Sequence, residues 1–137
     1  AGIDFTNLDG SQGYNPWQSY GQSKLANILC AKSLGQRLSD TKITANAVHP
    51  GVIKTNLSRY SAGPLFNVIQ FFANFFQRTV AQGAATQCYV ATHPSLSETS
   101  GAYFADSDIA VPSKQAQDSA LAQQLWNESL RLVEGYL

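Results

Sequence analysis

Apolar residues recur at helical spacing between residues 17 and 38, which predicts an amphipathic helix in this segment. The apolar positions are Tyr20, Leu25, Ile28, Leu29, Leu34 and Leu38. Asn15 and Pro16 suit the N-terminal end of such a helix, and the polar segment 39–42 suits the turn that follows it.

Two later segments also have a helical pattern. Residues 79–94 predict a helix that is closed by its final proline. Residues 118–135 predict an amphipathic helix with Asp118 as N-cap and Gly135 as stop. We expect the inward positions of this last helix to be Leu121, Leu125, Leu132 and Val133.

Two short apolar runs predict strands. The run Ile43–Val48 is stopped by Pro50 and Gly51, which is typical of a buried strand that ends in a turn. Residues 100–107 predict a second strand. The order helix, strand, helix, strand, helix predicts an α/β protein with a parallel sheet. Two or three strands make a poor independent sheet.

The composition is typical of a globular protein and argues against some classes of binding partner. The chain has 137 residues, enough for one domain, of which 44% are hydrophobic and 13% charged. A formal net charge of zero argues against nucleic acid as a partner. Cys30 and Cys88 lie in apolar surroundings without a metal-ligand cluster, so we expect two reduced cysteines in the core and no metal site.

Tyr20 and Lys24 stand four residues apart at the start of the first predicted helix. Residues at this spacing lie one above the other on a helix. An ammonium beside a phenol favours the phenolate, and a phenol tuned in this way can exchange a proton with an alcohol or a carbonyl. Taken alone the pair is weak evidence, because an exposed lysine and a half-buried tyrosine on one helix face would give the same pattern.

The segment Asn46–Thr55 strengthens the hypothesis of a ligand site. It places Pro50 and Gly51 at the carboxyl end of a predicted strand, and in open α/β sheets ligands bind at that edge. Gly51 permits close approach of the backbone to a ligand, and Thr55 supplies a hydroxyl four residues later.

Together these residues resemble the short-chain dehydrogenase/reductase family. Tyr20–Lys24 matches its Tyr-x-x-x-Lys motif, and Asn46–Thr55 matches its Asn-Ala-Val-x-Pro-Gly-x-Ile-x-Thr pattern. Residues 20–27, 47–57 and 83–94 are similar to the branch that holds retinol dehydrogenases, the WW-domain oxidoreductase and a chloroplast-envelope translocon dehydrogenase. The resemblance covers essentially the whole chain and implies the carboxyl-terminal half of a Rossmann-like, doubly wound parallel sheet with flanking helices.

The resemblance also implies roles for individual residues and a cofactor, NADP or NAD. Tyr20 would be the general acid/base of hydride transfer, and Lys24 would bind the nicotinamide ribose and favour the phenolate; both would contact the cofactor. Thr55 would hydrogen-bond the carboxamide or the neighbouring phosphate. The residues that would line the nicotinamide are Pro50, Gly51 and Val52.

Several features of the family are missing from residues 1–137. No glycine-rich turn of the form G-x-G-x-x-G or G-x-x-x-G-x-G occurs, nor does the family's Asn-Asn-Ala-Gly segment or its catalytic serine. We therefore expect residues 1–137 to be the carboxyl-terminal part of one short-chain dehydrogenase domain, inactive alone, with the missing amino-terminal half as its partner. The complete protein is expected to be a cytoplasmic homo-oligomer.

The segment Pro64–Gln77 is rich in phenylalanine and has a narrow polar stripe. It falls in the segment that the resemblance marks as the variable substrate loop, about residues 56–78. An apolar lid over a lipophilic alcohol or carbonyl substrate is one interpretation, and plain packing is the second. A membrane-surface segment is the third, which the lack of a basic polar face disfavours.

Two function classes follow for the complete protein. The first is an NAD(P)-dependent oxidoreductase that interconverts an alcohol and a carbonyl. The second is a non-catalytic binding or scaffold protein on the same fold. The intact pair of Tyr20 and Lys24 favours the first, because a scaffold has no need of that spacing.

Overall fold

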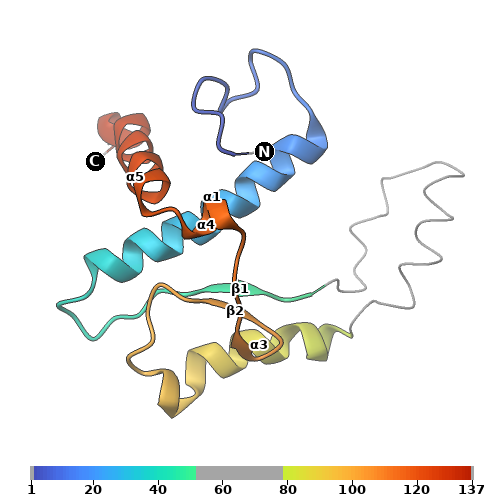
Figure 1. The fold of residues 1–137 in the computed structure, drawn as a ribbon, viewed down its shortest axis with the longest axis vertical. Helices are drawn as coiled ribbons and strands as arrows, with labels where there is room; N and C mark the ends of the chain where they lie inside the picture. Colours follow the sequence, from blue (N-terminus) through green and yellow to red (C-terminus); the bar gives the residue numbers. More distant parts are fainter. Residues whose placement is uncertain (1, 52–78, 137) are drawn as a thin grey trace, which may run out of the picture. The chain divides into compact units, whose positions relative to one another are not determined.

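The computed structural model describes residues 2–51 and 79–136, and Figure 1 shows its ribbon. The predictions for Val52, Thr55, the substrate loop and the phenylalanine-rich segment lie outside the described residues. The helices are α1 (Pro16–Arg37), α3 (Val80–Thr92), α4 (Lys114–Gln117) and α5 (Ser119–Val133), with short 3₁₀ helices η2 (Pro94–Leu96) and η3 (Glu134–Tyr136). The strands are β1 (Ala47–His49), β2 (Tyr103–Ala105) and β3 (Asp108–Ile109).

The chain divides into two compact units. The first contains residues 1–47, 97–103 and 110–137, and the second contains residues 48–96 and 104–109. The mixture of helices and strands confirms the predicted α/β class and is consistent with a partial Rossmann-like fold.

Helix α1 begins and ends where the local sequence predicts. The side chain of Asn15 accepts hydrogen bonds from the backbone N–H groups of Trp17 and Gln18, both at 3.1 Å, so it caps the helix. Pro16 occupies the first helical position, where its missing N–H costs nothing. The helix ends at Arg37 with Leu38 as C-cap, in agreement with the hydrophobic pattern.

The core of the first unit lies where α1 packs against α4 and α5. Its buried apolar members are Leu25, Leu29, Ala116 and Ala122, with Ile3, Ile28, Leu121 and Leu125 packed around them. The buried hydroxyl of Ser33 donates a hydrogen bond to the carbonyl oxygen of Ala122 at 3.2 Å. The guanidinium of Arg37 stacks over the ring of Trp126, 4.6 Å from its centroid, and leaves Trp126 only partly exposed.

Helix α5 has the N-cap that the sequence predicts, but its last turn is less covered than expected. The carboxylate of Asp118 accepts hydrogen bonds from the N–H groups of Ala120 and Leu121 at 2.8 and 3.1 Å. Leu132 and Val133 were expected to point inward, and this prediction is wrong: they are 53% and 42% exposed. The periodicity identifies the apolar side of a helix but not whether a neighbour covers it.

The sheet has the strand order β1, β2, β3 and is mixed. Ahead of the first two strands, the N–H of Gly101 donates to the carbonyl of Ala45 at 2.7 Å, and the N–H of Ala47 donates to the carbonyl of Ala102 at 2.9 Å. Both bonds advance in the same direction along the two segments, as in a parallel pair. Strand β3 pairs antiparallel with β2, an element that the sequence analysis missed.

The second unit contains α3 and residues 104–109 of the hairpin formed by β2 and β3. Thr79 and Gln82 form a reciprocal capping box at the start of α3. The buried hydroxyl of Thr86 in α3 accepts a hydrogen bond from the N–H of Ser107 in the hairpin turn at 3.1 Å. Phe104 is the buried aromatic residue of β2. The predicted helix of residues 79–94 is thus confirmed, with its end at Thr92.

Both cysteines are free thiols, as expected, but they do not lie in the core. Cys30 and Cys88 are exposed, so the prediction of core cysteines is wrong. Cys30 follows the buried Leu29 directly and is therefore turned about 100° around the helix from the buried stripe. An apolar neighbourhood in sequence does not place a residue on the buried face.

Candidate active site

Helix α1 places Tyr20 and Lys24 one turn apart on an exposed face. The buried face of the helix runs through Leu25, Leu29 and Ser33, which hold it against the core. The Tyr20 side chain is 58% exposed, and Lys24 is exposed beside it. The Lys24 ammonium nitrogen lies 5.2 Å from the centroid of the Tyr20 ring.

This arrangement brings a positive charge next to an accessible phenol. A cation within about 6 Å of an aromatic centroid is attracted to the ring. The hydroxyl of Ser23 donates to the carbonyl oxygen of Tyr20 at 2.8 Å, so it is committed to the helix backbone. The pair can therefore act as a proton donor and acceptor toward a bound ligand.

Pro50 and Gly51 follow β1 directly, at its carboxyl end. Gly51 has φ of 79°, in the left-handed region that side chains other than glycine adopt only at a cost. The lack of a Cβ leaves the backbone open to close approach by a flat ligand group. Tyr20 and Lys24 belong to the first unit and Pro50 and Gly51 to the second.

Asn46 ties the segment before β1 to the segment before β2. Its side-chain amide donates to the carbonyl oxygen of Thr99 at 2.7 Å, and its side-chain oxygen accepts from the N–H of Ala102 at 3.0 Å. Ala45 is held in the same region by a hydrogen bond from its N–H to the Ser100 hydroxyl at 3.1 Å. Asn46 is a position of the family's Asn-Ala-Val-x-Pro-Gly-x-Ile-x-Thr pattern, which by itself gives it no structural role. With these two hydrogen bonds the Asn46 side chain fixes the start of the strand that leads to Pro50.

An open groove of about 400 Å³ lies beside Lys24 within the first unit. Its lining includes apolar side chains together with hydroxyl and amide side chains. The lining residues are Gly21, Lys24, Leu25, Ile28, Tyr103, Pro112, Ser113 and Gln115. Lys24 lines the groove and is itself exposed, and Tyr20 is exposed as well.

The described residues contain no cluster of His, Cys, Asp and Glu that could hold a metal ion. His49 is exposed at the end of β1. The ring of His93 lies 4.7 Å from that of Tyr89, and its Nδ1 is 2.8 Å from the hydroxyl of Ser95. Among helices in the described ranges, none has the length and apolar character needed to cross a membrane.

Comparison with known proteins supports one family. The model of the short chain dehydrogenase family matches residues 3–63, which include the pair Tyr20 and Lys24 and the segment of Pro50 and Gly51. This match and the relatives below support the short-chain dehydrogenase/reductase family and, within it, the retinol dehydrogenase-like branch.

Three relatives illustrate this branch. The chain is 44% identical over 135 residues to short-chain dehydrogenase TIC 32 A, chloroplastic, of Brassica napus, covering 97% of this chain and 42% of that protein. It is 39% identical to retinol dehydrogenase 14 of Mus musculus, covering 96% of this chain and 40% of that protein. It is 37% identical to retinol dehydrogenase 11 of Homo sapiens, covering 96% of this chain and 41% of that protein. The chain thus spans about two fifths of the length of these relatives.

Proposed function

We propose that the full-length protein carrying this chain is an NAD(P)-dependent oxidoreductase that interconverts an alcohol and a carbonyl. The observation that carries the proposal is the accessible phenol of Tyr20 with the Lys24 ammonium 5.2 Å from its ring centroid. The match to the short chain dehydrogenase model and the similarity to retinol dehydrogenases support the same reaction class.

In this proposal Tyr20 moves the proton. Its hydroxyl donates a proton to the oxygen of a carbonyl as that oxygen becomes an alkoxide, and takes the proton back in the oxidative direction. Lys24 stabilises the phenolate that remains and donates hydrogen bonds to ribose hydroxyls. Because both side chains project from the same face of a helix held by the core, they keep their mutual position as the proton moves.

The residues present fit a nicotinamide cofactor. Gly51 at positive φ, directly after β1, gives a backbone surface without a Cβ at the strand's carboxyl end, where Pro50, Gly51 and Val52 would line the nicotinamide. Thr55 would hydrogen-bond its carboxamide or a phosphate. When bound, the cofactor supplies or accepts the hydride. NADP is the cofactor we favour, with NAD as the alternative.

The proposed substrate is a small lipophilic alcohol or carbonyl compound. Two of the relatives above are named retinol dehydrogenases, and the segment Pro64–Gln77 has the apolar composition expected of a lid over such a substrate. Homo-oligomerisation and a cytoplasmic location stay predictions, as does the assignment of residues 1–137 to the carboxyl-terminal half of one domain. Contact with a membrane surface remains the less favoured interpretation of the apolar segment.

The test is turnover by the full-length protein and its Tyr20→Phe variant with NADPH and NADH. The panel should contain long apolar and short polar aldehydes. We expect Tyr20→Phe to lose about 10²–10⁴-fold in kcat, because general acid–base catalysis supplies roughly that factor. Its Kd for the cofactor should stay nearly unchanged, since only one hydroxyl is removed. Turnover near wild type in this variant would overturn the role of Tyr20. A wild-type protein without turnover on the whole panel would overturn the proposal and favour a binding or scaffold protein.

A further inference from the structure

Gln22 lies on the opposite side of α1 from the pair Tyr20 and Lys24. At 100° per residue, it is turned roughly 160° from each of them around the helix axis. Its spacing of three, seven and eleven residues to Leu25, Leu29 and Ser33 places it on the buried face of α1. Gln22 is half-buried and is the polar residue at the N-terminal end of this face.

The side chain of Gln22 holds a distant segment of the chain. Its Oε1 accepts a hydrogen bond from the backbone N–H of Asp4 at 2.7 Å, across 18 residues of sequence. Next to this bond, Ile3 packs on the core, and a Cβ on Gly2 would lie 3.3 Å from the side-chain nitrogen of Gln115. The segment from Gly2 to Asp4 therefore lies between α1 and the start of α4, and Gln22 supplies its polar attachment.

The segment after Asp4 is stiffened by its own hydrogen bonds. The Asp4 carboxylate accepts from the N–H and the hydroxyl of Thr6 at 3.0 and 2.7 Å. Asn7 closes the following loop, since its side chain donates to the carbonyl of Gly13 at 2.8 Å and accepts from the N–H of Gln12 at 2.9 Å. The loop then runs into the N-cap Asn15 of α1. It is thus attached to the first turns of the helix at both of its ends.

From this geometry we infer that Gln22 is a positioning residue for the pair Tyr20 and Lys24; the inference rests on the proposed function. Gln22 lies in the helical turn that carries both residues, whereas the buried apolar face begins only at Leu25. Its hydrogen bond to Asp4 fixes the rotation of this helical turn about the helix axis. The same bond holds the segment from Gly2 to Asp4 against the turn. Misplacing reacting groups by about 1 Å can cost about 10²-fold in rate.

The test compares three variants of the full-length protein with wild type. Gln22→Met keeps the length of the side chain and removes the acceptor, and Gln22→Glu keeps an acceptor oxygen. Gln36→Met is the matched control, because Gln36 is an exposed glutamine in the last turn of the same helix. The measurements are kcat, KM, cofactor Kd, the midpoint of thermal unfolding and the hydrogen-exchange rate of the Asp4 amide.

We expect Gln22→Met to lower kcat at least about tenfold. Cofactor Kd and KM should change less than about threefold, and exchange at Asp4 should speed up. Gln22→Glu should recover most of kcat, and Gln36→Met should match wild type. A kcat for Gln22→Met within about twofold of wild type would overturn the inference, as would unchanged exchange at Asp4. If Gln22 had a merely structural role, kcat would fall only in proportion to the fraction of protein that is unfolded. That result would also overturn the inference.

Tyr20→Phe, measured in parallel, separates the two proposals. An inactive Tyr20→Phe together with a fully active Gln22→Met rejects only the role of Gln22. A wild type without turnover rejects the proposed function and with it the positioning role. A fully active Tyr20→Phe rejects the role of Tyr20 in the reaction and with it the positioning role of Gln22, whereas the reaction class stands.

Discussion

Gly35 of α1 and Gly101 before β2 meet backbone to backbone. A Cβ placed on Gly35 would lie 2.6 Å from the nitrogen of Gly101 and 2.8 Å from its Cα, closer than real Cβ atoms come to other heavy atoms. Gly101 itself has φ of 74°, in the left-handed region. Helix α1 therefore approaches the segment before β2 as closely as only glycine allows. The approach sets how the helix that carries Tyr20 and Lys24 lies against that segment.

Gly35→Ala should destabilise the protein despite the higher helix propensity of alanine. The added methyl group must displace backbone atoms, and overpacking of this kind typically costs about 1–3 kcal/mol or more. Thermal or denaturant unfolding of the full-length protein measures the effect. Gly21→Ala is the matched control in the same helix, because a Cβ there meets no heavy atom of the described residues within 4 Å. It should be neutral or stabilise by up to about 1 kcal/mol. Equal effects of the two substitutions would contradict the role of this contact.

Lys24→Ala should impair both turnover and cofactor binding, because the ammonium serves the phenol and the ribose. We expect kcat to fall by at least about 10²-fold, the lower range for general acid–base catalysis, and Kd for NADPH to rise. Lys42→Ala is the control, since Lys42 is exposed in the loop after α1. Unchanged turnover and unchanged cofactor Kd in Lys24→Ala would reject the assigned role.

Helices α1, α3 and α5 could be predicted from sequence because their signals are local, whereas the four-residue helix α4 was missed. Asn15 with Pro16, Thr79 with Gln82, and Asp118 each cap the helix that follows them. Strand β3 was missed because it has two residues and because its turn lacks glycine. Asp106 and Ser107 adopt φ of 57° and 60° in that turn, as in a type I′ hairpin, and this pair of residues is a weak sequence signal for it.

In the candidate site, too, the local relationships could be predicted from sequence and the long-range contacts could not. Tyr20 and Lys24 could be paired from sequence because a four-residue spacing on a helix fixes their proximity. The contacts of Asn46 and Gln22 could not, because their partners Thr99 and Asp4 lie 53 and 18 residues away. Such bonds depend on how the helix and the strands pack, which a local pattern does not specify.

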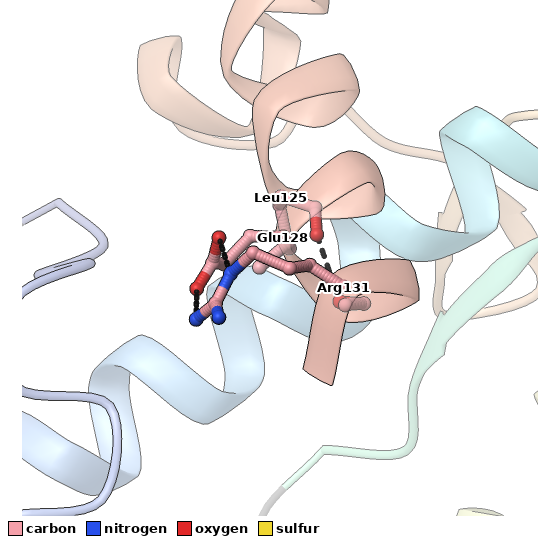
Figure 2. Close-up of polar contacts among 4 residues, drawn as sticks. Leu125, Glu128 and Arg131 are labelled. Carbon is pink, nitrogen blue, oxygen red and sulfur yellow. Dashed lines mark hydrogen bonds and ion pairs between the residues drawn. The ribbon is translucent and has the colours of Figure 1, made fainter. Parts of the chain in front are cut away.

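The ion pair of Glu128 and Arg131 on α5 should make a small, pH-dependent contribution to stability (Figure 2). The Arg131 guanidinium donates two hydrogen bonds to the Glu128 carboxylate, at 2.6 and 3.0 Å, and holds the pKa of that carboxyl below its ordinary value of 4.5. A carboxyl with a lowered pKa in the folded state stabilises it above the unfolded pKa. This stabilisation fades as the pH falls below 4.5 and through the folded pKa.

Glu128→Gln should therefore lower the unfolding temperature slightly at pH 7 and leave it nearly unchanged at acid pH. High salt should reduce the difference at pH 7, because the pair lies at the surface. Unfolding midpoints of wild type and variant at several pH values measure the effect. A difference that stays constant between pH 7 and pH 3 would show that the ion pair is not its cause.

Residues 1–137 expressed alone should neither bind a nicotinamide cofactor tightly nor reduce a carbonyl. The pyrophosphate supplies much of the anchoring of a dinucleotide, and no glycine-rich turn of the family's kind occurs in this sequence. Many apolar side chains of the described residues are also exposed, among them Trp17, Ile43, Val80, Ile109, Val111, Leu132 and Val133. We therefore expect the isolated chain to self-associate or to lose fixed packing.

Calorimetric titration of the isolated chain with NADPH and NADH tests this expectation. Titration after mixing with a separately expressed amino-terminal half is the matching experiment, in which binding should appear because the pyrophosphate gains a helix N-terminus. Size-exclusion chromatography and near-ultraviolet circular dichroism report whether the isolated chain is monomeric and well packed. A monomeric, well-packed chain that binds the cofactor with micromolar Kd would mean that residues 1–137 contain a complete cofactor site. In that case the groove beside Lys24 would have to hold the cofactor without help from a glycine-rich turn.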